Sequence, residues 1–147
     1  MALFTSEISP AGPICAAIVG LSEAREDALR RAGQPLPSLV PIRALIDTGA
    51  SCTCVDPSVL NSLNLTPTGS VSVNTPSTGS EPHTAHQFDV GFVIVPPDGP
   101  VLILRTVPVI ASDLLSQQGF HALVGRDILE QCLFVYNGKG GFFTLAF

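Results

Sequence analysis

An apolar run that leads directly into Asp47-Thr48-Gly49 is the feature that most constrains this 147-residue chain. Residues 44–46 are Ala, Leu and Ile, which predict a buried strand, and Asp47 stands at its end. A carboxylate in such a place is costly unless another group pairs with it. Gly49 provides the backbone freedom that a tight loop needs. The sequence therefore predicts a strand that delivers one carboxylate to a sharp turn.

A second motif follows later in the chain and reads Leu123-Val124-Gly125-Arg126-Asp127-Ile128-Leu129. Two apolar residues precede Gly-Arg, and a short helix is predicted to begin there. The chain contains seven Asp residues, and only Asp47 has the Asp-Thr-Gly context. If a second copy of Asp47 is its partner, that copy has to come from another chain.

Together the two motifs resemble those of the retropepsin-like aspartic proteases, and the resemblance covers most of the chain, from Ile14 to Phe147. It implies an all-β, mostly antiparallel closed barrel with a flap hairpin and two or three short helices. It also implies a homodimeric endopeptidase that cleaves an extended peptide or protein substrate. One Asp from each protomer would activate a water molecule, and no cofactor is expected.

The resemblance assigns roles to the residues around Asp47, which would be the catalytic acid. Thr48 and Gly49 would support the active-site loop, with the Thr48 hydroxyl bonding across the dimer axis. The alternative for Thr48 is a hydrogen bond to its own loop backbone. Ala50 is small enough to leave a substrate subsite open. At the position of Ser51, retroviral members have an acid. Cellular and bacterial relatives have a serine there, as this chain does.

The second motif receives structural and binding roles from the same resemblance. Gly125 and Arg126 would support the site, and Val124 would line the substrate pocket. Because Ser51 replaces the acid that pairs with this arginine in retroviral members, Arg126 needs another partner. A weak surface pair with Glu130 is the simpler alternative.

Residues 70–95 are predicted to form a β-hairpin that would act as the flap. A run of alternating residues predicts its second strand: His86, Phe88, Val90, Phe92 and Ile94. Ser77, Thr78 and Gly79 are the candidates for the tip, where backbone groups would bond to the substrate main chain. An ordinary exposed hairpin is the alternative.

The rest of the pattern predicts one domain over residues 14–147, preceded by a loose N-terminal arm over residues 1–13. Many short apolar runs with turn signals favour a mostly antiparallel barrel or sandwich. Ser22 and Gly33 bracket a predicted surface helix, and Asp56-Pro57 begins another. Residues 142–147 are expected to contribute an interface strand to the dimer.

Charge and composition exclude several other classes of function. The net charge is −5 with a single Lys, so nothing resembles a nucleic-acid footprint. No apolar run has the length of a membrane span, and the first residues do not resemble a signal peptide, so we expect a cytoplasmic protein. Charged residues make up 13% of the chain, against about 25% on average. Either an apolar surface is buried by oligomerisation, or a compact β domain has few helices to carry charge.

The four cysteines are expected to be free thiols in apolar surroundings, namely Cys15, Cys52, Cys54 and Cys132. Cys52 and Cys54 would share one face of a strand. A metal site would need further ligands at suitable spacing, so none is expected. The main alternative to the protease is a dimeric peptide-binding or scaffold domain with the same fold and no catalysis. The intact Asp-Thr-Gly favours the protease, because a binding domain gains nothing from a costly carboxylate.

Overall fold

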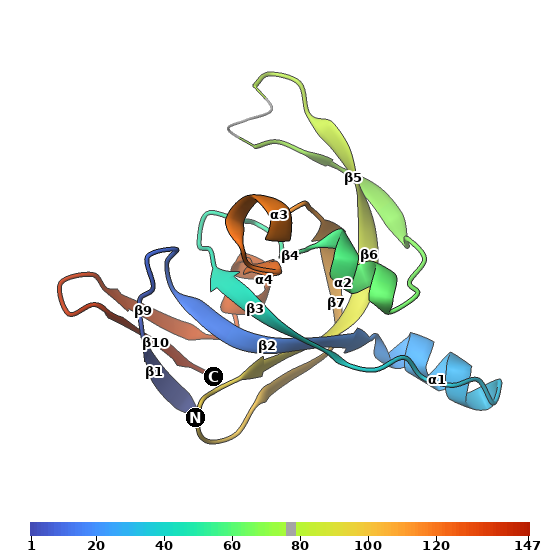
Figure 1. Ribbon diagram of the computed structural model, residues 1–147, viewed down its shortest axis with the longest axis horizontal. Helices are drawn as coiled ribbons and strands as arrows, with labels where there is room; N and C mark the ends of the chain where they lie inside the picture. Colours follow the sequence, from blue (N-terminus) through green and yellow to red (C-terminus); the bar gives the residue numbers. More distant parts are fainter. Residues whose placement is uncertain (76–78) are drawn as a thin grey trace.

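A closed β-barrel forms the body of the protein in the computed structural model, which describes residues 1–75 and 79–147 (Figure 1). Six strands close it in the order β2-β3-β8-β4-β7-β6, with β6 pairing back to β2. Their bounds are β2 Ile14–Leu21, β3 Val40–Ile46, β4 Cys54–Val55, β6 His83–Val95, β7 Leu102–Ala111 and β8 Ala122–Val124. The closed, mostly antiparallel barrel that the sequence predicted is therefore confirmed.

Parallel pairing of β3 with β8 decides where the two sequence motifs meet. Leu45 lies opposite Leu123 and Ile46 opposite Val124. Since parallel strands end at the same edge of a sheet, the chain segments that follow β3 and β8 leave the barrel together. β4 pairs antiparallel with β8 and parallel with β7, which closes this side of the barrel.

The barrel core is filled by alternate residues of its strands. On β6 the side chains of Phe88, Val90, Phe92 and Ile94 are buried, as their spacing predicted. Full burial of each such side chain contributes about 1.5–3 kcal/mol, so this strand anchors the barrel. His86 was expected on the same face but is exposed, because there β6 has left the barrel and pairs with β5.

β5, Gly69–Val73, and the first part of β6 form a hairpin that rises from the barrel (Figure 1). The predicted hairpin over residues 70–95 is therefore present. Two of its predicted tip residues, Ser77 and Thr78, lie outside the described residues. Gly79 is exposed in a turn with a φ of 63°.

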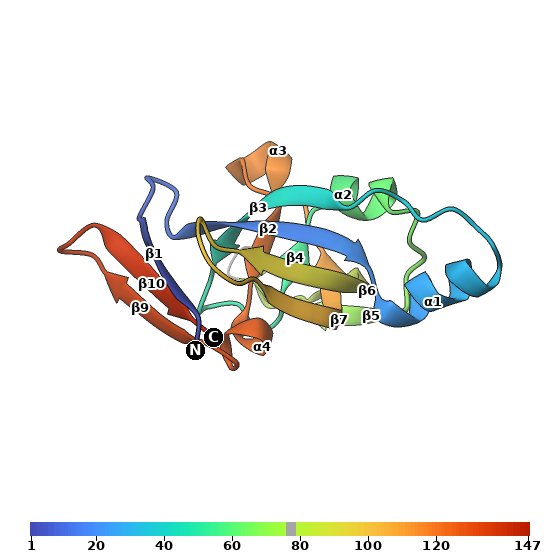
Figure 2. The ribbon, with the colours of Figure 1, turned by 90° about the horizontal axis from the view of Figure 1, so that it is seen from below.

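A second, three-stranded sheet joins both ends of the chain beside the barrel (Figure 2). Its order is β1-β10-β9, with bounds β1 Leu3–Glu7, β9 Leu133–Asn137 and β10 Phe142–Ala146. The prediction of a loose arm over residues 1–13 was wrong, because β1 pairs with β10 along its whole length. Phe4 is buried against Phe143 in an edge-to-face ring contact, so the arm is tied to the core cluster.

The central place of β10 limits how residues 142–147 could serve as the predicted interface strand, which stays a prediction. Both backbone edges of β10 are already paired, one with β1 and the other with β9. A partner chain cannot add a strand to it. All three strands present exposed apolar side chains of this sheet: Leu3, Leu133, Val135, Tyr136 and Phe142.

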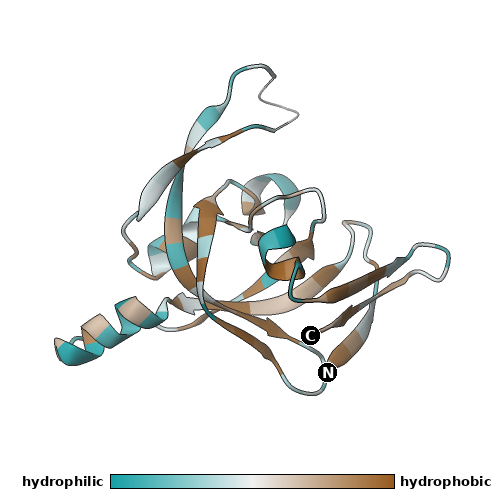
Figure 3. Ribbon diagram, turned by 180° about the vertical axis from the view of Figure 1, so that it is seen from behind, coloured by the Kyte–Doolittle hydropathy of each residue, from teal (hydrophilic) through white to brown (hydrophobic). Residues whose placement is uncertain are grey.

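The described residues contain four short helices, one more than the highest number expected. They are α1 Glu23–Arg31, α2 Pro57–Ser62, α3 Leu115–Gln118 and α4 Arg126–Leu129. Ser22 caps α1 as predicted, and α1 projects from the barrel as a largely hydrophilic helix without buried residues (Figure 3). None of these helices has the length and apolar character needed to cross a bilayer.

Asp56 explains the helix that the sequence did not predict. Its Oδ1 accepts hydrogen bonds from the backbone and side chain of Ser58 and thus caps α2. Its Oδ2 accepts from the backbone N–H groups of Leu114 and Leu115 at 2.9 and 2.8 Å, which starts α3. One buried carboxylate therefore joins two helix starts that are far apart in the sequence.

Candidate active site

The loop that carries Asp47 follows β3 and is fixed to the end of β8. The Asp47 N–H donates to the Val124 carbonyl at 3.0 Å, and the Ala50 N–H donates to the Asp47 carbonyl at 3.2 Å. The Gly49 N–H donates to Asp47 Oδ1 at 2.8 Å. Asp47 is half-buried, whereas Thr48 and Gly49 are exposed. The loop backbone thus orients one carboxylate oxygen, and no described residue donates to Oδ2.

Arg126 holds the same loop from the second motif. Its guanidinium donates to the Thr48 carbonyl at 2.9 Å and to the Gly49 carbonyl at 3.4 Å. Its backbone N–H donates to the Ala50 carbonyl at 2.9 Å. The expectation that Arg126 needs another partner is thereby answered, since it binds the loop backbone rather than Glu130. A charged donor on a carbonyl gives a stronger hydrogen bond than a neutral one.

A buried network behind the loop connects the two motifs. The Gly125 N–H donates to Thr53 Oγ1 at 3.1 Å, and Thr53 Oγ1 donates to Asp127 Oδ1 at 2.8 Å. The Thr53 N–H donates to Asp127 Oδ2 at 2.9 Å, and Oδ1 also accepts from the Ile128 N–H. Thr53 is fully buried. Sequence reasoning missed the roles of Thr53 and Asp127, although Asp127 directly follows Gly-Arg in the second motif.

Gly125 is required by the close packing of the two segments. A Cβ atom at this position would lie 2.5 Å from the Cys52 carbonyl carbon and 2.9 Å from the Thr53 nitrogen. Both are backbone atoms, which cannot move aside. The Gly-Arg pair is thus explained by sterics at the glycine and by hydrogen bonding at the arginine.

A cleft separates the Asp47 loop from the β5–β6 hairpin. It consists of two adjoining cavities of about 270 and 500 Å³. The two cavities share lining residues from the loop, the hairpin and β7: Ser51, Cys52, Val73, Asn74 and Ile110. Asp47 and Ala50 face the smaller cavity from one side, and His83 faces it from the hairpin. An extended chain lying in the cleft would therefore touch both the carboxylate and the hairpin.

The cleft includes some of the predicted binding residues and not others. Ala50 lines it, as expected of an open subsite. Val124 does not line it, because its side chain is fully buried in the core. Successive side chains of a strand point to opposite faces, so the neighbouring Leu123 lines the cleft instead. Gly79 is not among its lining residues.

Cys52 and Cys54 also line the cleft, which the sequence had indicated only as two thiols on one face. All four cysteines are free. Burial, with smaller contributions from the nearby Cys52 and Asp127, raises the pKa of the Cys54 thiol to about 12. A thiol of this pKa stays protonated near neutral pH and is a poor nucleophile. Cys54 is therefore unsuited to replace Asp47 as the reactive group.

Among the described residues that line the cleft, only Asp47 and Asp127 carry carboxylates. Both Asp127 oxygens already accept hydrogen bonds from Thr53. Asp47 is therefore the only carboxylate of the cleft, within residues 1–75 and 79–147, that has an oxygen without a hydrogen bond from a described residue. No group of three or more metal-ligating side chains occurs in the described ranges either.

The fold and the site together define a retropepsin-like aspartic protease. The crystal structure of a retropepsin-like aspartic protease from Rickettsia conorii has a similar fold, with a TM-score of 0.58 at 14% sequence identity. The similarity covers 98% of this chain and 90% of that one. A family model described as aspartyl protease matches residues 33–128, more than half of the chain. The chain belongs to this aspartyl protease family. A comparison with curated proteins gave no match.

Proposed function

We propose that the protein is a homodimeric aspartic endopeptidase whose two Asp47 residues form the catalytic pair. The observation that carries this proposal is that Asp47 is the one described carboxylate of the cleft with an oxygen that accepts no hydrogen bond from a described residue. Asp127, the other acid there, is bound to Thr53 through both oxygens. Peptide hydrolysis of this type needs two carboxylates, so the second has to come from another copy. A two-fold dimer supplies it by symmetry.

The pair works because two carboxyl groups about 3 Å apart share one proton. The ionised member takes a proton from a water molecule, whose oxygen forms a bond to the substrate carbonyl carbon. The protonated member donates to the carbonyl oxygen as negative charge develops there. When the carbon–nitrogen bond then breaks, the carboxyl group that took a proton from the water passes it to the leaving amine, and a hydroxyl of the intermediate returns a proton to the other carboxylate. The Gly49 N–H on Oδ1 keeps each carboxylate oriented through these steps.

Thr48 and Arg126 would hold the two loops in position. Thr48 is exposed, and its carbonyl is fixed by Arg126 at 2.9 Å. We propose that its hydroxyl bonds to the partner loop across the two-fold axis. Gly49 keeps the loop compact, because a Cβ there would lie 3.1 Å from Asp47 Oδ1.

The substrate is proposed to be an extended peptide, covered by the β5–β6 hairpin acting as a flap. Val73, Ile110 and Leu123 supply apolar wall to the smaller cavity, which favours apolar substrate side chains. His83 and Asn74 add polar groups on the hairpin side. Closing such a hairpin excludes water from the reacting bond. Ser77, Thr78 and Gly79 remain the proposed tip residues that bond to the substrate backbone.

The proposed dimer surface is the β1-β10-β9 sheet. Leu133 and Tyr136 of β9 are 58% and 56% exposed, and Leu3 of β1 is 63% exposed. Burying apolar surface of this kind drives association. Sedimentation at micromolar concentration is expected to show a dimer. A chain that stays monomeric at every concentration and still cleaves peptide would contradict the shared site.

The decisive experiment is digestion of a broad peptide library by the wild type and by Asp47→Asn. The variant keeps the shape of the side chain but removes the charge and the shared proton. We expect it to fold, to bind peptide, and to lose turnover by several orders of magnitude. Asp98→Asn, in an exposed turn, is the matched control and should cleave normally.

The pH dependence gives a second readout. Wild-type cleavage should fall as pH rises through the upper pKa of the pair, and again at very low pH when both acids are protonated. If wild type and Asp47→Asn bind peptides equally and neither cleaves any library member, the protease proposal fails. The domain would then be a dimeric peptide-binding or scaffold protein.

A further inference from the structure

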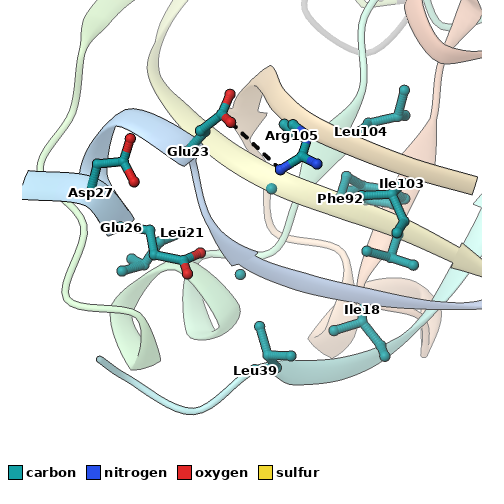
Figure 4. Close-up of a pocket in the computed structure, with 13 residues that line it drawn as sticks. Ile18, Leu21, Glu23, Glu26, Asp27, Leu39, Phe92, Ile103, Leu104 and Arg105 are labelled. Atoms are coloured by element: carbon teal, nitrogen blue, oxygen red, sulfur yellow. Dashed lines mark ion pairs between the residues drawn. The ribbon is translucent and has the colours of Figure 1, made fainter. Parts of the chain in front are cut away.

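A separate cavity lies away from Asp47, between α1 and the strands β2, β6 and β7 (Figure 4). Its volume is about 230 Å³, and it shares no lining residue with the two cavities of the cleft. We call it the glycine groove, defined by Gly20, Gly91, Leu39, Ile103, Glu26 and Asp27. Pockets that enclose a whole small-molecule ligand measure roughly 300–1,000 Å³. The groove is smaller, so it suits one or two side chains of a larger partner.

The floor of the groove is a pair of glycines. Gly20 of β2 lies directly opposite Gly91 of β6 in the sheet register. A Cβ atom on Gly20 would lie 2.6 Å from Leu39 Cδ2, and one on Gly91 would lie 2.6 Å from the Leu21 carbonyl oxygen. The two glycines therefore leave the sheet without side chains at this point and let neighbouring groups approach closely.

The walls of the groove are apolar and unusually open to solvent. Leu39 is 65% exposed and Ile103 is 61% exposed, and Ile18 also lines the groove (Figure 4). An exposed leucine held over a bare glycine is not explained by the packing of the core. These walls offer a surface on which an apolar chain of several methylene groups can pack.

The rim on the α1 side is acidic. Glu23, Glu26 and Asp27 line the groove, and Arg105 is the one cationic group among its lining residues. Arg105 reaches the groove beside a β-bulge, where β7 has one more residue than β6, and pairs with Glu23 at 3.5 Å (Figure 4).

Glu26 pairs with Arg30 at 2.6 Å, whereas no described residue forms an ion pair with Asp27. Once Arg30 is counted with its partner Glu26, three carboxylates face two arginines, which leaves one excess negative charge, at Asp27.

We propose that the glycine groove docks an arginine or lysine side chain from an extended segment of a partner protein. The apolar stem of such a side chain packs on Leu39 and Ile103, and its cationic head meets Glu26 and Asp27. Charge complementarity and the size of the groove both select this occupant. The proposal does not depend on whether Asp47 is catalytic, because the two sites share no residue.

The test uses fluorescein-labelled peptides of the form Ala-Leu-Xaa-Leu-Ala, with Arg, Lys, Gln or Glu at Xaa, and the full chain. Fluorescence anisotropy gives the affinity, and mass spectrometry confirms that each peptide stays intact. Because exposed ion pairs contribute modestly, the Arg and Lys peptides should bind roughly three- to tenfold more tightly than the Gln peptide. This difference should shrink as salt is added.

Two variants assign the effect to the groove. Glu26→Gln with Asp27→Asn should reduce the affinity for the Arg peptide to that for the Gln peptide. Both residues lie on α1, which has no buried residue, so the variant should fold. Ile103→Thr should weaken both peptides. Glu130→Gln with Asp98→Asn removes two exposed carboxylates elsewhere and should change neither affinity.

Amide resonances of the glycines show where the peptide binds. In ¹⁵N–¹H spectra, the Arg peptide should shift the signals of Gly20 and Gly91 more than the Gln peptide does, whereas any shift of the Gly49 signal should be the same for both peptides. Equal affinity for the Arg and Gln peptides, shifts confined to Gly49, or no binding would overturn the proposal. It would also be overturned if the Glu26→Gln and Asp27→Asn variant lost the dimer, since a second copy would then occupy the groove.

Discussion

Replacing Asp127 by Asn tests whether the buried network behind the Asp47 loop positions the active site. Asp127 accepts three hydrogen bonds, two from Thr53 and one from the Ile128 N–H. An amide has the same shape but only one accepting oxygen. If that oxygen keeps the place of Oδ1, the amide NH₂ group faces the Thr53 N–H across the 2.9 Å that Oδ2 spans now.

The expected cost follows from the burial of this contact. Thr53 is fully buried, so its N–H cannot turn to solvent once the carboxylate is gone. Leaving one buried donor without an acceptor costs about 1–3 kcal/mol of the free energy of unfolding. Thr53→Val removes the acceptor of the Gly125 N–H and should cost a similar amount. Since both changes break one network, the double variant should lose about 0.5–3 kcal/mol less than the two single losses added together.

Urea unfolding of the four proteins at one protomer concentration and pH 7 measures these free energies. Asp98→Asn is the control and should stay within about 0.5 kcal/mol of wild type. If the loop moves with the network, peptide turnover by Asp127→Asn should fall at least about tenfold, because small misplacements of catalytic groups are costly. A loss of stability below about 0.5 kcal/mol, or single effects that add within about 0.3 kcal/mol, would refute the reasoning.

Three further changes have defined outcomes. Burial raises the pKa of Asp56, but its four hydrogen bonds outweigh this and lower the pKa to about 2. The resulting stability of about 2 kcal/mol is complete above the unfolded-state pKa of about 3.9 and is lost as pH falls through 2. Asp56→Asn should therefore cost that amount at pH 7 and nothing below pH 2; a difference that is constant with pH would contradict this. Burial raises the pKa of Cys15 and of Cys54 to about 12. Iodoacetamide at pH 8 should therefore leave both thiols unlabelled in the folded protein and label both in urea, as mass spectrometry can show. Fast labelling of the folded protein would argue against the burial. Gly125→Ala should lower the free energy of unfolding in urea by about 1–3 kcal/mol, because its Cβ meets backbone atoms. Gly69→Ala, with open space around the new Cβ, is the control. Equal stability of the two variants would count against the steric argument.

Much of the fold was readable from local patterns. The alternation along β6, the Ser22 and Asp56 helix starts, and the Asp-Thr-Gly and Gly-Arg motifs each depend on neighbours in the sequence. Such features follow from backbone sterics, capping and the two-residue period of a strand. They predicted a mostly antiparallel barrel or sandwich, the hairpin and the loop of Asp47 without knowledge of long-range contacts, and the family resemblance implied that the barrel is closed.

Contacts between distant segments decided the rest. The first residues contain Ser, Pro and Gly, yet Leu3–Glu7 forms a strand because β10 lies beside it and Phe143 buries Phe4. No local signal tells that Asp127 binds Thr53, that Arg126 binds the Thr48 carbonyl, or that Leu123 rather than Val124 faces the cleft. These outcomes depend on the parallel register of β3 and β8, which pairs residues almost eighty positions apart. The sequence by itself determined which groups could do chemistry. The tertiary structure determined which of these groups accept or donate hydrogen bonds and which remain available, because hydrogen-bond partners and burial exist only in the folded chain.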